Sequence, residues 1–156
     1  MPVTDELLVL QGEAALGIYV EHIHFKGLAF QHGAFSLPRH RAHDGQAAIS
    51  LGAAVTTRGA RACRFEDLEI AHVGQYGVWF AEGSRDNVLS RCELHDLGAG
   101  GVKMGETSRK SEEARNADRN TVDNCFIHDG GHVAHAGVGV WIGRSTHNRV
   151  TYNEIC

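Results

Sequence analysis

Three octapeptides decide the fold of this chain: NVLSRCEL (Asn87–Leu94), NTVDNCFI (Asn120–Ile127) and NRVTYNEI (Asn148–Ile155) superimpose without gaps. CRFEDLEI (Cys63–Ile70) and IHFKGLAF (Ile23–Phe30) align with them as two earlier copies. In every copy the third and eighth positions are apolar, and the sixth is leucine, cysteine or asparagine. A repeat of roughly 20–50 residues is typical of stacked coils, each of which buries its apolar face against its neighbours.

A second short segment follows most copies and alternates apolar with other residues, as a strand with one buried face does. These segments are AISL (Ala48–Leu51), GVWF (Gly77–Phe80), GVKM (Gly101–Met104) and GVWI (Gly139–Ile142). No segment longer than about ten residues has helical periodicity, and the 19 glycines suit frequent tight turns. The sequence therefore predicts an all-β parallel solenoid of about four to five coils.

Two residue types at fixed places in the repeat have predicted structural roles. Asn87, Asn120 and Asn148 begin successive copies, and asparagine tolerates left-handed backbone angles and can hydrogen-bond along the stack to the next coil. Cys92 and Cys125 are expected to stack inward as small apolar residues. A disulfide between them is not expected, because side chains stacked in register rarely reach the required dihedral angle.

The number of residues from one copy to the next varies, and the additional residues of the longer repeats fall into three predicted inserted loops, at 33–45, 106–119 and 130–136. Loops on a rigid scaffold often carry binding residues, although the charged segment 106–119 also fits a solvated loop. The copies continue to Cys156 without a polar capping segment. Residues 1–156 are therefore expected to be part of one β-helix domain, a fragment whose missing coils would pack against it.

Composition argues against several classes of function. The formal net charge is −4 and no basic stripe is present, so no nucleic-acid partner is expected. No apolar run approaches the roughly 18 residues of a membrane span, so no membrane partner is expected. Met1–Leu10 contains two acidic residues and does not fit a signal peptide. The cysteines form no C-x-x-C pair and the histidines lack the spacing of a ligand set, so no metal or other cofactor is predicted.

The middle residues of the GVWF-type strands are predicted to point outward and to form a column across the coils: Ser50, Trp79, Lys103 and Trp141. The neighbours of the two tryptophans would fill the inside of the coil: Val78, Phe80, Val140 and Ile142. Exposed aromatic rings on a rigid sheet stack against the apolar C–H faces of sugars, although tryptophan is also a frequent core residue. Trp79 and Trp141 are therefore predicted to form a platform for a sugar.

A second predicted column lies in the turn that leads into those strands: His32, His72, Asp96 and Asp129. Neighbouring coils are about 4.8 Å apart, so Asp96 and Asp129 cannot both ionise easily and one is expected to have a raised pKa. One protonated and one ionised carboxyl is the pair that a glycosidase needs. The alternative is that both aspartates only form turns. The two columns are expected to border one groove.

The residues also resemble a known family. The strings IHFKGLAFQHGAF…LP, QAAI, HDLGAGGVKMGE, FIHDGG and GVGVWIG…HNRVTYNEI, which run from about Leu8 to Cys156, are similar to those of the right-handed parallel β-helix enzymes of glycoside hydrolase family 141. The resemblance implies a right-handed single-stranded β-helix and hydrolysis of plant cell-wall polysaccharide, as an α-L-fucosidase or xylanase. It implies an extracellular or periplasmic location and acidic catalytic residues, which match Asp96 in HDLGAGG and Asp129 in HDGG.

The main hypothesis is therefore a glycoside hydrolase whose catalytic residues are Asp96 and Asp129, acting on a carbohydrate substrate. The residues expected to contact the substrate are Trp79, Lys103, Trp141, His72, His32 and His128. One alternative is a polysaccharide lyase, in which Lys103 is the base and the acidic column holds Ca²⁺. Another is a non-catalytic β-helix adhesin or carbohydrate-binding segment that uses only the tryptophans.

Overall fold

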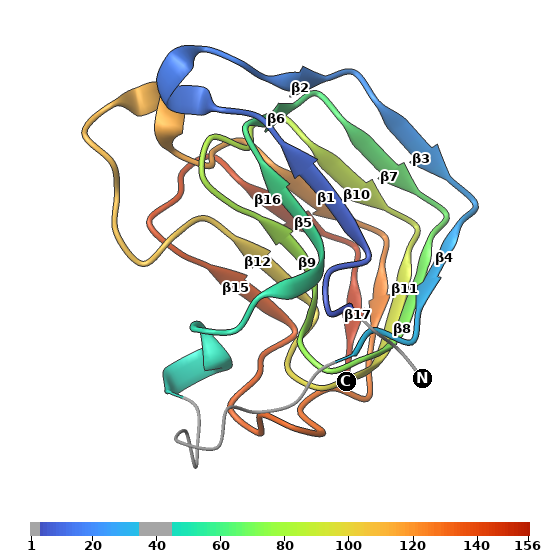
Figure 1. The fold of residues 1–156 in the computed structure, drawn as a ribbon. Coiled ribbons are helices and arrows are strands. Elements are labelled where there is room, and N and C mark those ends of the chain that lie inside the picture. Colours follow the sequence, from blue (N-terminus) through green and yellow to red (C-terminus); the bar gives the residue numbers. More distant parts are fainter. Residues whose placement is uncertain (1–3, 35–44) are drawn as a thin grey trace.

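The computed structural model describes residues 4–34 and 45–156. The chain winds through stacked coils, and three parallel five-stranded sheets run along the stack (Figure 1). Sheet 1 consists of β1 (Leu8–Gln11), β5 (Ala53–Arg58), β9 (Tyr76–Phe80), β12 (Val102–Met104) and β15 (Val140–Ile142). Sheet 2 consists of β3 (His24–Lys26), β7 (Arg64–Glu66), β10 (Val88–Ser90), β13 (Thr121–Asp123) and β16 (Arg149–Thr151). Sheet 3 consists of β4 (Ala29–Gln31), β8 (Glu69–Val73), β11 (Glu93–Leu97), β14 (Phe126–Ile127) and β17 (Glu154–Ile155).

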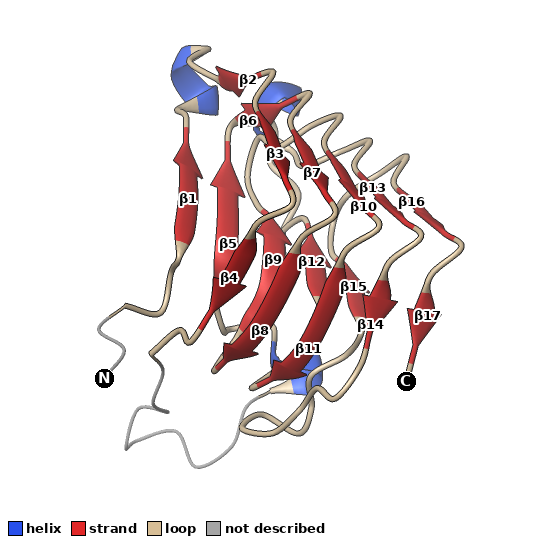
Figure 2. Cartoon of the chain, turned by 90° about the vertical axis from the view of Figure 1, so that its right-hand side faces the viewer, coloured by secondary structure: helices blue, strands red, loops and turns tan. Residues whose placement is uncertain are grey.

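The remaining elements lie between these strands. A short parallel pair joins β2 (Val20–Glu21) to β6 (Ala60–Arg61). Three 3₁₀ turns complete the described part of the chain: η1 (Ala14–Leu16), η2 (Gln46–Ala48) and η3 (Glu113–Arg115). Viewed from the side, strands of successive coils lie next to one another in the same direction (Figure 2). The predicted all-β solenoid is confirmed.

The register of the strands confirms the alignment of the octapeptides. Phe65 of β7 pairs with Leu89 of β10, which in turn pairs with Val122 of β13. All three side chains are completely buried. The eighth position forms a second inward column, in which Leu94 pairs with Ile70 on one side and Ile127 on the other. Burial of these apolar columns between the three sheets is the main driving force for the fold.

The asparagines that begin successive copies form a hydrogen-bonded ladder, as predicted. Oδ1 of Asn120 accepts the backbone N–H of Asn87 at 3.1 Å, and Oδ1 of Asn148 accepts the backbone N–H of Asn120 at 2.9 Å. The left-handed angles fall one residue earlier than expected, on Asp86 and Arg119, each at φ 58°. The asparagine side chain thus bonds the next coil, while the residue before it makes the turn.

Each coil turns at left-handed residues, and the predicted turn column is one such set. His32, His72, Asp96 and Asp129 have φ values of 63°, 54°, 49° and 49°. Aspartate and histidine are among the non-glycine residues found most often in this backbone region, because their short polar side chains bond locally. This requirement favours the residue types in the column, but it does not dictate them, because Ala62, Arg91 and Tyr152 adopt the same angles at other turns.

The cysteines behave as expected within the described residues. Cys63, Cys92 and Cys125 are buried free thiols, and Cys156 is exposed. The backbone N–H of Leu68 approaches Sγ of Cys92 at 3.5 Å, so the thiol also acts as a weak acceptor between coils.

One predicted strand is wrong. Residues 48–51 were expected to be the sheet 1 strand of their coil, but η2 occupies Gln46–Ala48 and the strand is β5, in which Thr56 pairs with Trp79. Both segments are short and contain small and apolar residues, and the pairing of Val55 with Val78 in the core fixes the choice. No helix of the described residues has the length and apolar character required to cross a membrane.

The predicted inserted loops differ in how much of them the structure describes. Residues 35–44 of the first loop lie outside the described residues. Residues 106–119 leave the stack after β12, form η3 and return with Asp118 almost completely buried. Asp118 makes ion pairs with Arg85 and Arg109, so this end of the loop is tied to the coils. Residues 130–136 lie between β14 and β15.

Candidate functional site

The predicted turn column forms a chain of polar contacts at the end of sheet 3. The rings of His32 and His72 are stacked with centroids 4.9 Å apart. Nδ1 of His72 is hydrogen-bonded to Oδ2 of Asp96, whose Oδ1 lies 3.4 Å from Nε2 of His132. Asp129 follows on the next coil, where its backbone carbonyl accepts the N–H of Leu97 at 3.0 Å. The structure therefore brings the predicted residues into neighbouring positions.

Asp96 does not have the raised pKa that the sequence predicted for one of the two carboxyls. The hydrogen bond from His72 holds the pKa of Asp96 below its usual range, and this outweighs the opposing effect of desolvation. Asp129 is bonded to Nδ1 of His128 at 2.9 Å, and this bond raises the pKa of His128. The expectation fails for Asp96 because the sequence did not reveal that imidazoles would pair with the carboxylates.

Further histidines extend the column along the outer face of sheet 3. The rings of His95 and His128 are stacked at 5.3 Å, and each approaches a glutamate of the neighbouring coil, Glu69 at 3.1 Å and Glu93 at 3.3 Å. The side chains of Asp96 and Asp129 are 47% and 71% exposed, so this surface is open to solvent. Within residues 4–34 and 45–156, no three histidine, cysteine or acidic side chains converge as a metal site.

The predicted tryptophan column lies on the outer face of sheet 1. Lys103 of β12 pairs in register with Trp79 of β9 on one side and Trp141 of β15 on the other. Both tryptophans are half-buried, and the neighbours of Trp79, Val78 and Phe80, are completely buried, as the alternation predicted. The prediction is wrong for Ile142 beside Trp141, which is 46% exposed because β15 is the last strand of sheet 1, and Val140 is only partly buried. The indole N–H of Trp79 donates to the carbonyl of Gly105 at 3.0 Å, which fixes the orientation of the ring.

Lys103 does not have the exposed position that was predicted. Its side chain is completely buried, with Nζ 3.7 Å from the centroid of the Trp79 ring. Nζ also donates to the backbone carbonyls of Ile49 and Leu51. The physical reason is that residues 49–51 cross the outer face of the sheet here instead of forming a strand within it, so they cover the lysine. Ser50 therefore does not belong to the column of Trp79, Lys103 and Trp141, and Thr56 of β5 pairs with Trp79 in its place.

Two cavities flank Trp79. One, of about 340 Å³, is lined by Ile49, Ser50, Trp79, Lys103, Gly105, Glu106, Thr107 and Trp141. The other, of about 510 Å³, is lined by Gln11, Gly12, Glu13, Ala14, Ala15, Arg58, Trp79, Glu82 and Glu106. Neither cavity is lined by Asp96 or Asp129, so the groove expected to join the two predicted columns is not formed by these cavities.

Sequence reasoning missed the acidic residues of these cavities. Glu82 and Glu106 each follow a strand of sheet 1 by two residues, in FAE (80–82) and MGE (104–106). The hydrogen bond from Arg115 lowers the pKa of Glu82, whereas burial raises the pKa of Glu106. Both glutamates stand two residues after the end of a GVWF-type segment, and this common position was the sequence signal that could have identified them.

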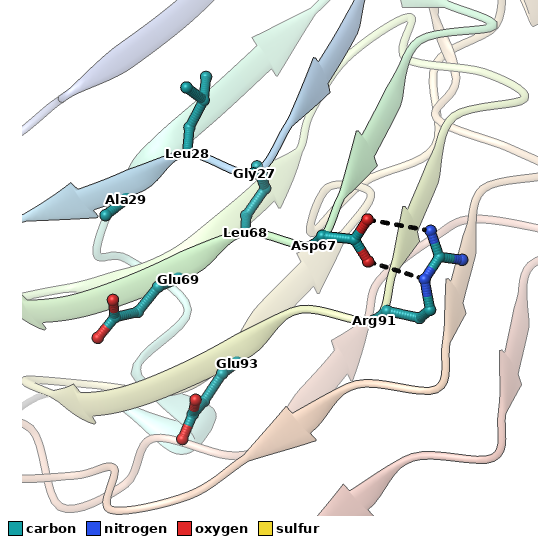
Figure 3. Close-up of a pocket in the computed structure, with 8 residues that line it drawn as sticks. All are labelled: Gly27, Leu28, Ala29, Asp67, Leu68, Glu69, Arg91 and Glu93. Carbon is teal, nitrogen blue, oxygen red and sulfur yellow. Dashed lines mark hydrogen bonds and ion pairs between the residues drawn. The ribbon is translucent and has the colours of Figure 1, made fainter.

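A third cavity, of about 410 Å³, lies over the turn between sheets 2 and 3 (Figure 3). Arg91 and Asp67 from neighbouring coils form a two-bonded ion pair at its edge, with Nε of Arg91 2.8 Å from Oδ1 of Asp67. The side chains of Glu69 and Glu93 extend from adjacent strands beside it. No predicted site residue lines this cavity, and its charges are already paired with neighbours, so we do not assign it a function.

Comparison with known proteins agrees with the architecture. The model of the right-handed beta helix region matches residues 51–156, which is more than half of the chain. No curated protein and no solved structure matches. The matching model describes the β-helix region in general and does not support membership of glycoside hydrolase family 141. Together with the three parallel sheets, this match shows that the chain belongs to the right-handed β-helix family.

Proposed function

We propose that the chain is part of a carbohydrate-active enzyme, a glycoside hydrolase acting on plant cell-wall polysaccharide or oligosaccharide of the fucosidase or xylanase type. The observation that carries the proposal is the half-buried Trp79 between two cavities of about 340 and 510 Å³. Cavities of roughly 300–1,000 Å³ hold small ligands, and aromatic rings offer apolar faces to sugar rings. The proposal includes an extracellular or periplasmic location, where such polysaccharides are found.

The catalytic assignment from the sequence, Asp96 and Asp129, remains a proposal with altered roles. Asp96 is held ionised by His72, so it would be the base or nucleophile, and the proton of the acid would be held by the hydrogen-bonded pair of Asp129 and His128. His32, His72 and His128 would then orient these carboxyls or contact the substrate. This version requires that a sugar bind on an open surface, since both side chains are substantially exposed.

The lyase alternative is disfavoured by the position of Lys103. A lyase base needs an unprotonated amine that reaches the substrate. Nζ of Lys103 donates to two backbone carbonyls and lies against Trp79, so the amine is already engaged by groups of the fold. Its side chain is also completely buried.

A non-catalytic carbohydrate-binding segment is the second candidate, because the tryptophan face is formed without any contribution from the aspartates. The test measures sugar release from xylan and from fucosylated oligosaccharides, together with glycan binding by calorimetry. The hydrolase proposal expects the wild-type protein to release reducing sugar. Binding without release would leave the non-catalytic candidate, and neither binding nor release would overturn the carbohydrate function. The aspartate assignment requires Asp96→Asn or Asp129→Asn to lose about 100-fold or more in turnover.

A further inference from the structure

Glu82 and Glu106 occupy equivalent places in successive coils, two residues beyond the ends of β9 and β12. Oε1 of Glu106 accepts the backbone N–H of Glu82 at 3.0 Å. The parallel stack therefore brings both residues to the same edge of sheet 1, on the coils that carry Trp79 and Lys103. Asp96 lies before β12 and Glu106 after it, so the two sets of carboxyls are at opposite ends of the strand.

The surroundings of the two glutamates form a lined cavity rather than an acidic cluster alone. Both glutamates line the cavity of about 510 Å³, together with Trp79 and Arg58. Cζ of Arg58 lies 5.5 Å from the centroid of the Trp79 ring. Glu106 and Trp79 also line the second cavity, of about 340 Å³. A glycan lying across Trp79 would thus place sugar units on both sides of Glu106.

The two carboxyls have opposite environments. Oε1 of Glu82 is bonded to Nε of Arg115 at 2.6 Å and Oε2 lies 3.7 Å from Nζ of Lys110, so this carboxylate is held ionised. In Glu106 only Oε1 has a hydrogen-bond partner among the described residues, and burial together with the charge of Glu82 favours a proton on its carboxyl. A carboxyl with a raised pKa beside one with a lowered pKa is the arrangement that divides the roles of acid and base.

We propose that Glu106 and Glu82 are the acid and the base of a glycoside-cleaving site beside Trp79, in place of Asp96 and Asp129. The proposal rests on the carbohydrate function proposed above. The proton on Glu106 passes to the glycosidic oxygen as the bond from that oxygen to the anomeric carbon breaks, and the leaving sugar departs as an alcohol. Water adds to the anomeric carbon and gives a proton to the Glu82 carboxylate. Exchange with solvent then returns a proton to Glu106 and removes the one on Glu82.

The test substitutes Glu106→Gln, because glutamine keeps the acceptor for the N–H of Glu82 and removes only the acidic proton. We expect sugar release from xylo-oligosaccharide to fall by about 100-fold or more, the usual contribution of general acid catalysis. Sugar release by the Glu82→Gln variant is expected to fall by a similar factor. Glu21→Gln is the matched control, because Glu21 is an exposed residue of β2 that lines neither cavity, and it is expected to retain wild-type turnover. Far-ultraviolet circular dichroism checks that each variant is folded.

A dinitrophenyl glycoside separates an acid catalyst from a structural residue. Its leaving group needs no proton, so Glu106→Gln should cleave it at within about tenfold of the wild-type rate, while the oligosaccharide loss persists. Equal losses on both substrates would overturn the proposal. Retention of oligosaccharide turnover by Glu106→Gln, with loss in Asp96→Asn, would overturn it in favour of the aspartates. Absence of any sugar release by the wild-type protein would instead overturn the hydrolase function itself.

Discussion

The asparagine ladder provides the sharpest test of what holds the coils together. Asn120 is completely buried and bonds in two directions. Its Oδ1 accepts the backbone N–H of Asn87 at 3.1 Å, and its Nδ2 donates to the carbonyl of Ser84 at 2.9 Å. Neither of these backbone groups has another hydrogen-bond partner among the described residues. Asn120→Ala therefore leaves a donor and an acceptor unsatisfied inside the stack.

Each buried group left without a partner costs about 1–3 kcal/mol, so Asn120→Ala should lower the free energy of unfolding by roughly 2–6 kcal/mol. A domain is stable by only about 5–15 kcal/mol, so the variant should be close to unfolding. Urea denaturation followed by circular dichroism measures the change. Asn148→Ala is the matched control: its Oδ1 also bonds the coil before it, at 2.9 Å, but the side chain is only half-buried.

We expect the control to lose about 1 kcal/mol, because water can replace its bonds. A loss below about 1 kcal/mol in Asn120→Ala, or equal losses in the two variants, would refute the ladder as a major source of stability.

Three further predictions concern packing, charge and the buried lysine. Gly98→Ala should destabilise the fold by about 1–3 kcal/mol or more, because the added Cβ would lie 2.1 Å from the carbonyl oxygen of Gly74. Gly45→Ala, whose Cβ would have no described atom within 4 Å, should be neutral in the same urea assay. Asp129→Asn should lower the pKa of His128 in a proton NMR titration, and an unchanged titration would contradict the pairing. Because the pKa of His128 is raised in the folded state, the pair stabilises the fold fully at pH values below the ordinary histidine pKa. That stabilisation is lost as the pH rises through the pKa of His128 in the folded protein. Lys103→Met should cost about 2 kcal/mol by removing charged hydrogen bonds to Ile49 and Leu51, and an unchanged urea midpoint would show that these bonds contribute nothing.

The fold was predictable because the repeat appears directly in the sequence. The columns at Leu89 and Leu94 are apolar in every copy, and period-2 alternation identified β9, β12 and β15 correctly. The error at residues 48–51 arose because that segment has the alternation expected of a strand, whereas the true strand β5, AAVTTR, has no such alternation. Short strands have little sequence signal of their own, so their place is settled by partners in neighbouring coils.

The candidate site was less predictable because its chemistry depends on contacts between coils. The sequence placed Asp96, Asp129 and the two tryptophans in columns, but it gave no sign that His72 would pair with Asp96. The alternation places Lys103 on the same outer face of the sheet as Trp79, but a segment more than 50 positions away in the chain covers the lysine. The pKa of Glu82 is lowered chiefly by its hydrogen bond from Arg115, and that of Glu106 is raised chiefly by burial.

The most direct test of the central claim, that a glycan binds on the outer face of sheet 1, is an NMR titration with a xylo-oligosaccharide. The protein has only two tryptophans, so its indole N–H groups give two resolvable signals. The account predicts that the Trp79 indole signal, whose N–H bonds the carbonyl of Gly105, shifts and saturates while the ring signals of His72 and His128 stay in place. Shifts at the histidines with Trp79 unmoved would contradict it.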